Sequence, residues 1–157
     1  MRVLVTGGAG NIGLSLIDQL ISEKIETVLF DLPEQLEVSK SRINSNTETF
    51  HGSILDKSKL SKAIKGCTHV VHLAAVLGVQ NTEADKAHCL EINILGTQKT
   101  LNACIDEKVS KFIFASSSET YGEPIKTPIN EDSITQGKTV YAVSKLAGEE
   151  FVKAYSQ

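Results

Sequence analysis

The sequence of 157 residues contains few cysteines and no apolar run long enough to cross a membrane. Its three cysteines, Cys67, Cys89 and Cys104, are too few and too scattered for a disulfide framework or a zinc site. We therefore expect small buried thiols in a reducing compartment, which indicates a cytoplasmic protein without a bound metal.

Charged residues form no cluster of one sign. The chain has 16 basic and 19 acidic residues, a net charge of −3, and its basic residues are dispersed. This distribution lacks the electrostatic footprint of a protein that binds nucleic acid or an anionic membrane. Met1 leads almost directly into the strand-like run Arg2–Thr6, so we expect no signal or transit peptide. The length is that of one domain, 1–157.

Short apolar runs alternate with segments of helical spacing. The runs lack strict alternation, which is typical of strands buried on both faces: Arg2–Thr6, Thr27–Asp31, Thr47–His51, Thr68–Leu73 and Lys111–Ser116. The helical segments are Asn11–Ser22, Ser58–Lys65 with Asp56 as N-cap, Glu83–Lys108 and Val140–Tyr155. This order predicts an α/β fold, a doubly wound parallel sheet of five strands (a Rossmann fold) with right-handed crossovers.

Finer features of these segments yield further expectations. The first helix carries Ile12, Leu16, Ile17 and Leu20 on one face. The segment 121–139 shows no clear periodicity, so we expect a functional or mobile loop there. We expect the three prolines to lie in loops: Pro33, Pro124 and Pro128.

A glycine-rich turn follows the first strand and opens the first helix. Thr6–Gly13 reads TGGAGNIG and satisfies both G-x-G-x-x-G and T-G-x-x-G-x-x-G. Glycines there permit a tight turn, let a pyrophosphate approach the backbone and let the helix pack on the strand. A Walker A loop is excluded, because no Gly-Lys-Ser/Thr follows. The strand–turn–helix context favours dinucleotide binding over a glycine-rich turn without a ligand.

An acidic residue ends the second strand. Asp31 stands 18 residues after Gly13 and can accept hydrogen bonds from the adenosine ribose hydroxyls, while it would repel a 2′-phosphate. No arginine adjoins it in the sequence. The pattern favours NAD over NADP, against the alternative of a solvated aspartate at a strand end.

A tyrosine and a lysine share one face of the last predicted helix. Tyr141 and Lys145 are spaced i and i+4. An ammonium group nearby favours the phenolate and is expected to lower the tyrosine pKa towards neutral pH. The fifth strand ends in the run 115–119 (ASSSE), and open α/β sheets bind ligands at the carboxyl ends of their strands. Taken singly, an accidental Y-x-x-x-K and a polar loop entry are the better explanations of the two patterns.

Five motifs together make the chain resemble the extended short-chain dehydrogenase/reductases, in particular the NAD-dependent epimerase/dehydratase family. They occur in the family order and span nearly the whole chain: 5–13 (VTGGAGNIG), 72–75 (HLAA), 93–97 (NILGT), 115–122 (ASSSETYG) and 141–149 (YAVSKLAGE). The resemblance implies an enzyme that acts on nucleotide-activated sugars.

The resemblance also implies roles for single residues. Tyr141 would be the acid/base for a sugar hydroxyl, Lys145 would tune Tyr141 and hold the nicotinamide ribose, and Ser117 matches the catalytic Ser/Thr. Leu73, Ala74 and Ala75 would line the ribose and nicotinamide side of the groove, Asn93 would lie near the cofactor, and Ile54 would lie beside the adenine. The expected cofactor-binding set is completed by Gly7, Gly10, Asn11, Ile12, Gly13, Asp31 and Leu32.

The implied chemistry is hydride transfer from a sugar carbon to NAD, which gives a transient keto-sugar. Dehydratases of the family tend to carry Asp-Glu after the catalytic Ser/Thr, whereas this chain has Ser118-Glu119. This difference disfavours dehydration and leaves an epimerase, a decarboxylase and a reductase open, and among these we expect an epimerase-type enzyme. Glu119 is either a catalytic group or a capping or loop carboxylate.

The chain departs from the family pattern in its extent. Family members continue beyond the Y-x-x-x-K helix into a C-terminal substrate region, so we expect either part of a longer architecture or a natural short form. A non-catalytic NAD(H)-binding module, or a piece without turnover by itself, is the alternative function. Ser53 replaces a frequent aspartate that reads the adenine, and 137–140 (GKTV) replaces a proline-containing approach to Tyr141. The resemblance implies a homodimer through the 83–108 and 140–155 helices.

Overall fold

The chain forms one parallel sheet with helices packed on both faces, as the computed structural model shows for residues 1–156, apart from the side chain of Val79. The strand order is β3-β2-β1-β4-β5. The strands are β1 (Arg2–Thr6), β2 (Glu26–Asp31), β3 (Glu48–His51), β4 (His69–His72) and β5 (Lys111–Phe114). The predicted fold class, a doubly wound Rossmann sheet of five strands, is confirmed. The strand order reverses between β1 and β4, which is where such sheets bind ligands.

Helices alternate with these strands along the chain. They are α1 (Asn11–Ser22), α2 (Pro33–Ser39), α3 (Lys57–Ile64), α4 (Val79–Ala84), α5 (Lys86–Leu90), α6 (Thr97–Asp106) and α7 (Val140–Tyr155). A π-helical segment, Glu91–Gly96, joins α5 to α6, and short 3₁₀ helices cover Lys40–Arg42 and Ser118–Tyr121. The predicted N-cap of α3 is confirmed, because the Asp56 carboxylate accepts a hydrogen bond from the Lys59 N–H at 3.1 Å.

The core has two parts, one on each face of the sheet. Val3 and Val5 pack with Leu14 and Ile17 of α1, whereas Leu4 belongs to the cluster formed with α3 and α6. Neighbouring positions of β1 therefore face opposite layers, as expected for a strand buried on both faces.

The expectation of burial on both faces is wrong for β3 and β5. β3 exposes most of its residues, and Ile113 in β5 is 45% exposed. Both strands lie at the edges of the sheet, where each has one neighbouring strand in the described part of the chain. Edge strands receive less cover than central ones.

Three local expectations need correction. The predicted helix Glu83–Lys108 is divided at Asp85, whose carboxylate accepts a hydrogen bond from the His88 N–H at 2.9 Å and so caps α5. Pro33 begins α2, a position that tolerates proline because its missing N–H is not needed there. Ile12 is 73% exposed, and α1 buries Leu14 with Ile17.

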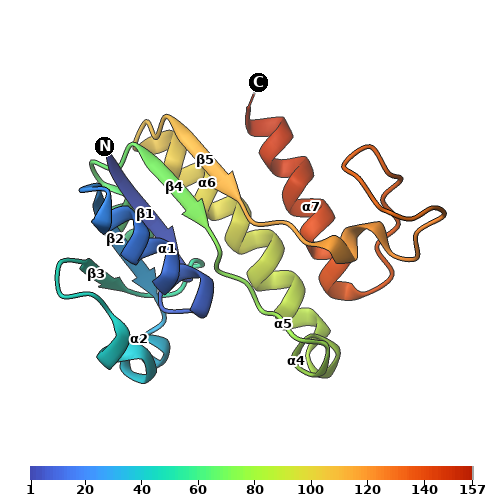
Figure 1. The fold of residues 1–157 in the computed structure, drawn as a ribbon, viewed down its shortest axis with the longest axis horizontal. Coiled ribbons are helices and arrows are strands. Elements are labelled where there is room, and N and C mark those ends of the chain that lie inside the picture. The colour runs from blue at the N-terminus through green and yellow to red at the C-terminus, as the bar shows by residue number, and fades with distance from the viewer. Residues whose placement is uncertain (157) are drawn as a thin grey trace.

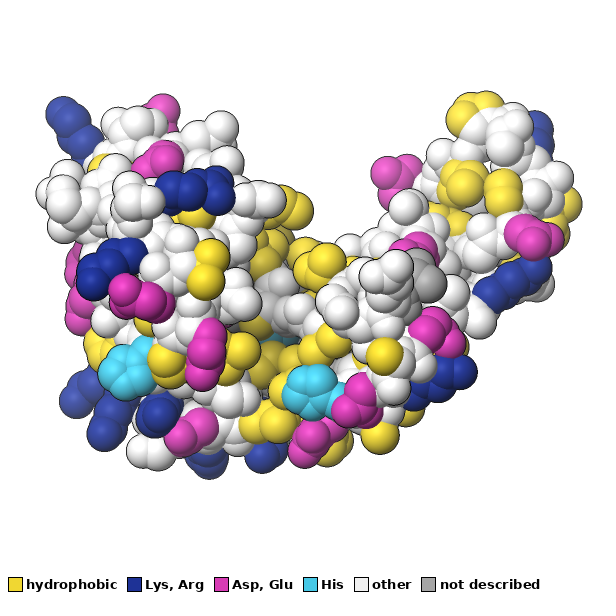
Figure 2. All heavy atoms as spheres, turned by 90° about the horizontal axis from the view of Figure 1, so that it is seen from below, with side chains coloured by type: hydrophobic (Ala, Val, Ile, Leu, Met, Phe, Trp, Pro, Cys, Tyr) yellow, Lys and Arg dark blue, Asp and Glu magenta, His cyan; other side chains and the backbone are white. Residues whose placement is uncertain are grey.

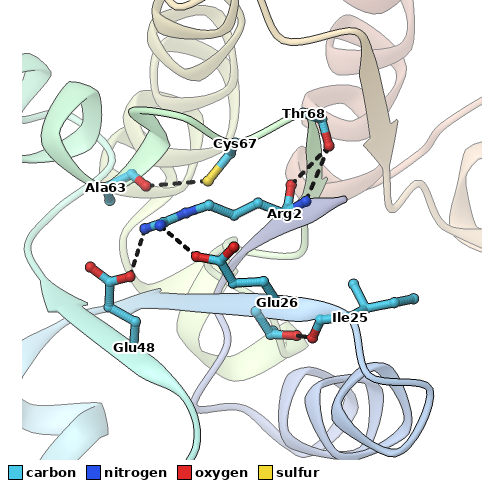
Figure 3. A network of polar contacts seen from close by, with 8 residues as sticks. Arg2, Ile25, Glu26, Glu48, Ala63, Cys67 and Thr68 are labelled. Atoms are coloured by element: carbon cyan, nitrogen blue, oxygen red, sulfur yellow. Dashed lines mark hydrogen bonds and ion pairs between the residues drawn. The ribbon is translucent and has the colours of Figure 1, made fainter.

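Arg2 links neighbouring strands at the end of the sheet where the strands begin. Its guanidinium group donates hydrogen bonds to the carboxylates of Glu26 and Glu48, both at 2.6 Å (Figure 3). One side chain thus links β1 to β2 and β3. Cys67 lies beside it, and all three cysteines are buried free thiols, as predicted. Among the described helices, none has the length and apolar character needed to traverse a bilayer.

Candidate active site

Most predicted site segments lie at the opposite end of the sheet, because each follows the carboxyl end of a strand: the glycine turn, Asp31, Leu73–Ala75 and the run 115–119. The arrows of Figure 1 point towards this edge, and Figure 2 views the molecule from that side. The surface is hollowed between the bulk of the domain and the projecting segment 122–139, and hydrophobic side chains line the hollow. That segment contains no helix or strand, which agrees with the predicted long loop.

The glycine turn forms a backbone cradle after β1. Gly7 has a φ of 67°, and a Cβ there would lie 2.7 Å from the Ala74 nitrogen. A Cβ on Gly13 would lie 2.6 Å from the Gly7 carbonyl oxygen. The N-cap of α1 is Gly10, with no side-chain cap and no acidic residue in the first turn. The N–H groups and positive dipole end of α1 are therefore suited to a phosphate, and the turn fits a dinucleotide.

Asp31 is oriented at the end of β2 by two backbone groups. Its carboxylate accepts hydrogen bonds from the N–H of Ala9 at 2.9 Å and of Leu32 at 2.8 Å. Burial raises the pKa of this carboxyl, and the two N–H donors act in the opposite direction. A carboxylate offers about four lone-pair positions, so acceptor capacity remains for the hydroxyls of a ribose.

The segment after Asp31 folds back onto the glycine turn. The hydroxyl of buried Ser39 donates to the Ala9 carbonyl oxygen at 2.8 Å, and Arg42 donates to the Asn11 side-chain oxygen at 3.0 Å. An arginine thus lies beside the turn although none adjoins Asp31 in the sequence. Sequence reasoning missed it because α2 was not predicted. Pro33, which stands at the first position of α2, was the available signal, because proline is frequent at helix starts.

The opposite wall of the hollow follows β4. Asn93 lies in the π-helical segment, where its side chain accepts a hydrogen bond from the Val76 N–H at 2.8 Å and donates to the Val76 carbonyl at 3.0 Å. It also donates to the Ser144 hydroxyl at 3.0 Å. At 2% exposure, Asn93 shapes the segment that continues from Leu73, Ala74 and Ala75. π-Helical turns are frequent at functional sites.

Ile54 belongs to the core. Its side chain is 5% exposed, and a Cβ on Gly96 would overlap it. Packing in the core cluster, together with the close approach of Gly96, therefore covers most of its surface. Its expected place beside an adenine stays a prediction.

Lys145 is buried at the end of β5. Its ammonium group donates to the Ala115 carbonyl oxygen at 2.9 Å and lies 4.9 Å from the centroid of the Phe114 ring and 5.6 Å from that of Tyr141. Burial lowers the pKa of Lys145 to about 8. The expected proximity of Lys145 and Tyr141 is present. Gly148 lets α7 approach β5, because a Cβ there would overlap Phe114.

The pKa of Tyr141 differs in direction from the expectation. Burial raises it, and the carboxylate of Glu119 adds to the increase. A hydrogen bond with the Ser117 hydroxyl acts in the opposite direction. The structure thus brings Ser117 and Tyr141 together, but desolvation of the phenolate outweighs the Ser117 hydrogen bond, and the expected lowering of the tyrosine pKa is not found.

Glu119 holds the start of α7. The Thr139 hydroxyl donates to the Glu119 carboxylate at 3.0 Å and accepts from the Ala142 N–H at 3.0 Å, which caps the helix. The carboxylate also lines a small pocket beside the tyrosine, formed by Gly78, Thr82, Glu83, Glu119, Thr139 and Tyr141. Both expected roles of Glu119 therefore remain compatible with its position. No group of three or more potential metal ligands occurs among the described side chains.

Comparisons with known proteins agree with this arrangement. A family model described as the NAD dependent epimerase/dehydratase family matches residues 3–157. A UDP-glucose 4-epimerase of Halalkalibacterium halodurans is 32% identical over 153 residues, covering 95% of this chain and 44% of the relative. A UDP-N-acetyl-alpha-D-glucosaminuronate decarboxylase of Bacillus cytotoxicus is 32% identical over 164 residues, covering 99% and 50%.

Solved structures of related enzymes share the fold of this chain. The UDP-glucose 4-epimerase of Thermus thermophilus, in complex with NAD, has a TM-score of 0.91 and 31% identity, and the match covers 100% of this chain and 51% of that one. The chain thus spans about half the length of the proteins it matches. Because the family model matches nearly every residue and the fold agrees, the chain belongs to the NAD-dependent epimerase/dehydratase family.

Proposed function

We propose that this chain carries the NAD-binding and proton-transfer parts of an enzyme that acts on nucleotide sugars, with Tyr141 as its acid/base. The observation that carries the proposal is the grouping of Ser117, Tyr141 and Lys145 at the end of β5, at the same edge as the glycine turn. A domain that only bound a dinucleotide would not need these proton-transfer groups.

NAD fits the observed cradle better than NADP. The backbone of Gly7–Gly13 and the start of α1 would hold its pyrophosphate, and Asp31 would hold the ribose hydroxyls, whereas a 2′-phosphate would meet the Asp31 carboxylate. The related T. thermophilus epimerase was solved with NAD, which supports the same choice here. When bound, NAD supplies the acceptor and donor for a hydride from a sugar carbon.

Tyr141 exchanges the proton of a sugar hydroxyl in this proposal. Its raised pKa keeps the phenol protonated at neutral pH, so base catalysis requires a favourable environment for the phenolate. Ser117 acts in that direction, and Lys145 lies close enough to contribute. Lys145 would also hold the nicotinamide ribose.

Within this family, we propose that the enzyme is an epimerase. Relatives include an epimerase and a decarboxylase, and the chain has Ser118-Glu119 where dehydratases of the family tend to carry Asp-Glu. We also propose a cytoplasmic homodimer through the helical residues 83–108 and α7. Leu95 at 46%, Ile105 at 59% and Val143 at 48% exposure are apolar side chains that such an interface would cover.

Turnover with a matched pair of tyrosine variants tests the proposal. The chain is incubated with NAD and UDP-glucose or a UDP-uronic acid, and products are separated and identified. We expect Tyr141→Phe to abolish turnover. Tyr155→Phe, on the same helix as Tyr141, removes only a hydroxyl that donates to the Asn102 side chain of α6 and should retain turnover. NAD binding without any turnover would contradict the proposal for this chain and support the non-catalytic module. Equal activity of the two variants would contradict the role of Tyr141.

A further inference from the structure

His72 is a fully buried titratable side chain that the proposed chemistry does not use. It ends β4, is 1% exposed and contacts the rings of Phe112 and Phe114 on β5, with centroid distances of 5.7 and 6.1 Å. Both ring nitrogens are nevertheless occupied. Nδ1 lies 2.7 Å from the Thr6 hydroxyl, and Nε2 lies 3.1 Å from the Thr97 hydroxyl.

The neighbouring hydrogen bonds assign the proton on the ring. Thr97 has one hydroxyl proton, which it donates to the Asn93 carbonyl oxygen at 2.6 Å. It must therefore accept from His72, so Nε2 carries the hydrogen. Nδ1 is then an acceptor for the Thr6 hydroxyl, whose oxygen in turn accepts the Ala74 N–H at 3.4 Å. Every polar side-chain atom of this hydrogen-bond series has a partner of the complementary kind.

The two ends of this hydrogen-bond series reach opposite walls of the hollow. Thr6 directly precedes Gly7, so the Nδ1 side holds the phosphate-binding turn. Thr97 and Asn93 belong to the π-helical turn and its continuation, and the Asn93 amide fixes Val76 and the Ser144 hydroxyl next to Lys145. One imidazole ring therefore sets the relative position of the turn, the wall after β4 and the start of α7.

We propose that neutral His72, with its hydrogen on Nε2, is a positioning residue that aligns the phosphate side and the nicotinamide side of the cofactor site. This inference rests on the proposed NAD site. It assigns His72 no contact with substrate or cofactor, and its effect on binding passes through Thr6 on one side and through Thr97 and Asn93 on the other.

Two amide substitutions test separately the hydrogen bond of His72 with Thr6 and its hydrogen bond with Thr97. The Asn side chain places its oxygen near the position of Nδ1, so His72→Asn keeps an acceptor for Thr6 and loses the donor to Thr97. The Gln side chain reaches the position of Nε2, so His72→Gln keeps that donor and loses the acceptor. If the ring only filled space, the losses of affinity in the two variants would follow their losses of stability.

Calorimetric titration gives the affinities for ADP and for NAD. Because ADP lacks the nicotinamide half, its affinity depends only on the phosphate side of the site. For His72→Asn we expect ADP affinity within about twofold of the parent and NAD affinity about tenfold lower. For His72→Gln we expect both affinities to fall about tenfold. His69→Asn, at the other end of β4, is the control and should leave both unchanged. Denaturant unfolding of each variant reports stability independently.

Equal losses for the two amide variants, or losses that follow only the unfolding midpoints, would overturn the positioning role. If a variant does not fold, ¹⁵N NMR of the histidine rings in the parent protein decides the matter. We expect hydrogen on Nε2 and none on Nδ1 from pH 5 to 8, and the opposite tautomer or a charged ring contradicts the proposal. A parent protein with this tautomer that binds neither ADP nor NAD would instead refute the proposed function.

Discussion

The Asp31 carboxylate and the backbone N–H of Ala9 form a hydrogen bond of 2.9 Å that joins the end of β2 to the glycine turn. The other carboxylate oxygen accepts the Leu32 N–H at 2.8 Å, so the group is fixed in orientation before any ligand arrives. A preoriented acceptor loses little freedom when it binds a ribose, which favours affinity.

Asp31→Asn is predicted to weaken NAD binding and to reduce discrimination against NADP. The amide has one acceptor oxygen, so its NH₂ group must face either a backbone N–H or the ribose, and the negative charge is lost. We expect NAD affinity to fall about tenfold, by calorimetric titration, and the ratio of NAD to NADP affinity to decrease. Asp18→Asn is the control. Asp18 lies on α1, is exposed and accepts a hydrogen bond from the Asn44 side chain. An unchanged NAD to NADP ratio would count against the role of Asp31.

Gly7→Ala and Gly66→Ala form a matched pair at positive φ. Their φ angles are 67° and 76°, but a Cβ on Gly66 has nothing within 4 Å, whereas one on Gly7 lies 2.7 Å from the Ala74 nitrogen. We expect Gly66→Ala to cost about 1 kcal/mol of unfolding free energy from backbone strain alone and to leave NAD affinity intact. Gly7→Ala should cost more and abolish NAD binding. Equal effects in denaturant melts and titrations would show that the turn tolerates a side chain.

Thr139→Ala is predicted to destabilise the start of α7. It removes the helix cap and the partner of Glu119, at a cost of about 1 kcal/mol in denaturant unfolding. Glu119→Gln keeps an acceptor for Thr139 and should retain the parent stability. Comparing turnover of the Gln variant with the parent then decides between the two roles of Glu119. Retained turnover supports a holding carboxylate, and lost turnover at full stability supports a catalytic one.

The stability of the fold is predicted to depend on His72 below neutral pH. Burial, assisted by the Lys145 ammonium, lowers the pKa of His72 from 6.5 to about 3. Between these values the unfolded chain binds the proton and the folded chain does not, so the contribution is complete above pH 6.5 and is lost as the pH falls. For this one group, the unfolding free energy changes by at most about 1.4 kcal/mol per pH unit.

A comparison with His72→Gln isolates this effect from the carboxylates, which titrate in both proteins. The parent should be the more stable near pH 7, and the difference in unfolding free energy should shrink as the pH falls below 6.5. Parallel stability curves for parent and variant between pH 7 and 4 would show that His72 is not held neutral by burial.

Features encoded by local pattern could be predicted from the sequence. The turn Thr6–Gly13, the five strands and the Tyr141 and Lys145 pair follow from glycine positions, apolar runs and helical spacing, and the structure places them as expected within about two residues. The exposure of β3 and β5 could not be predicted, because it depends on which strands occupy the edges of the sheet.

Features that depend on packing were not accessible. Arg42 reaches Asn11 only because α2 docks through Ser39 onto the turn. Asn93 was expected near the cofactor, but its hydrogen bonds to Val76 depend on the π-helical turn. The raised pKa of Tyr141 reflects burial, which the i and i+4 spacing with Lys145 does not reveal.

Calorimetric titration of this chain with NAD, and then with NADP, tests the central claim most directly. The cradle of Gly7–Gly13 and the fixed carboxylate of Asp31 predict saturable NAD binding with one site per chain and much weaker NADP binding. Failure to bind either dinucleotide, in a sample that unfolds cooperatively, would contradict the account.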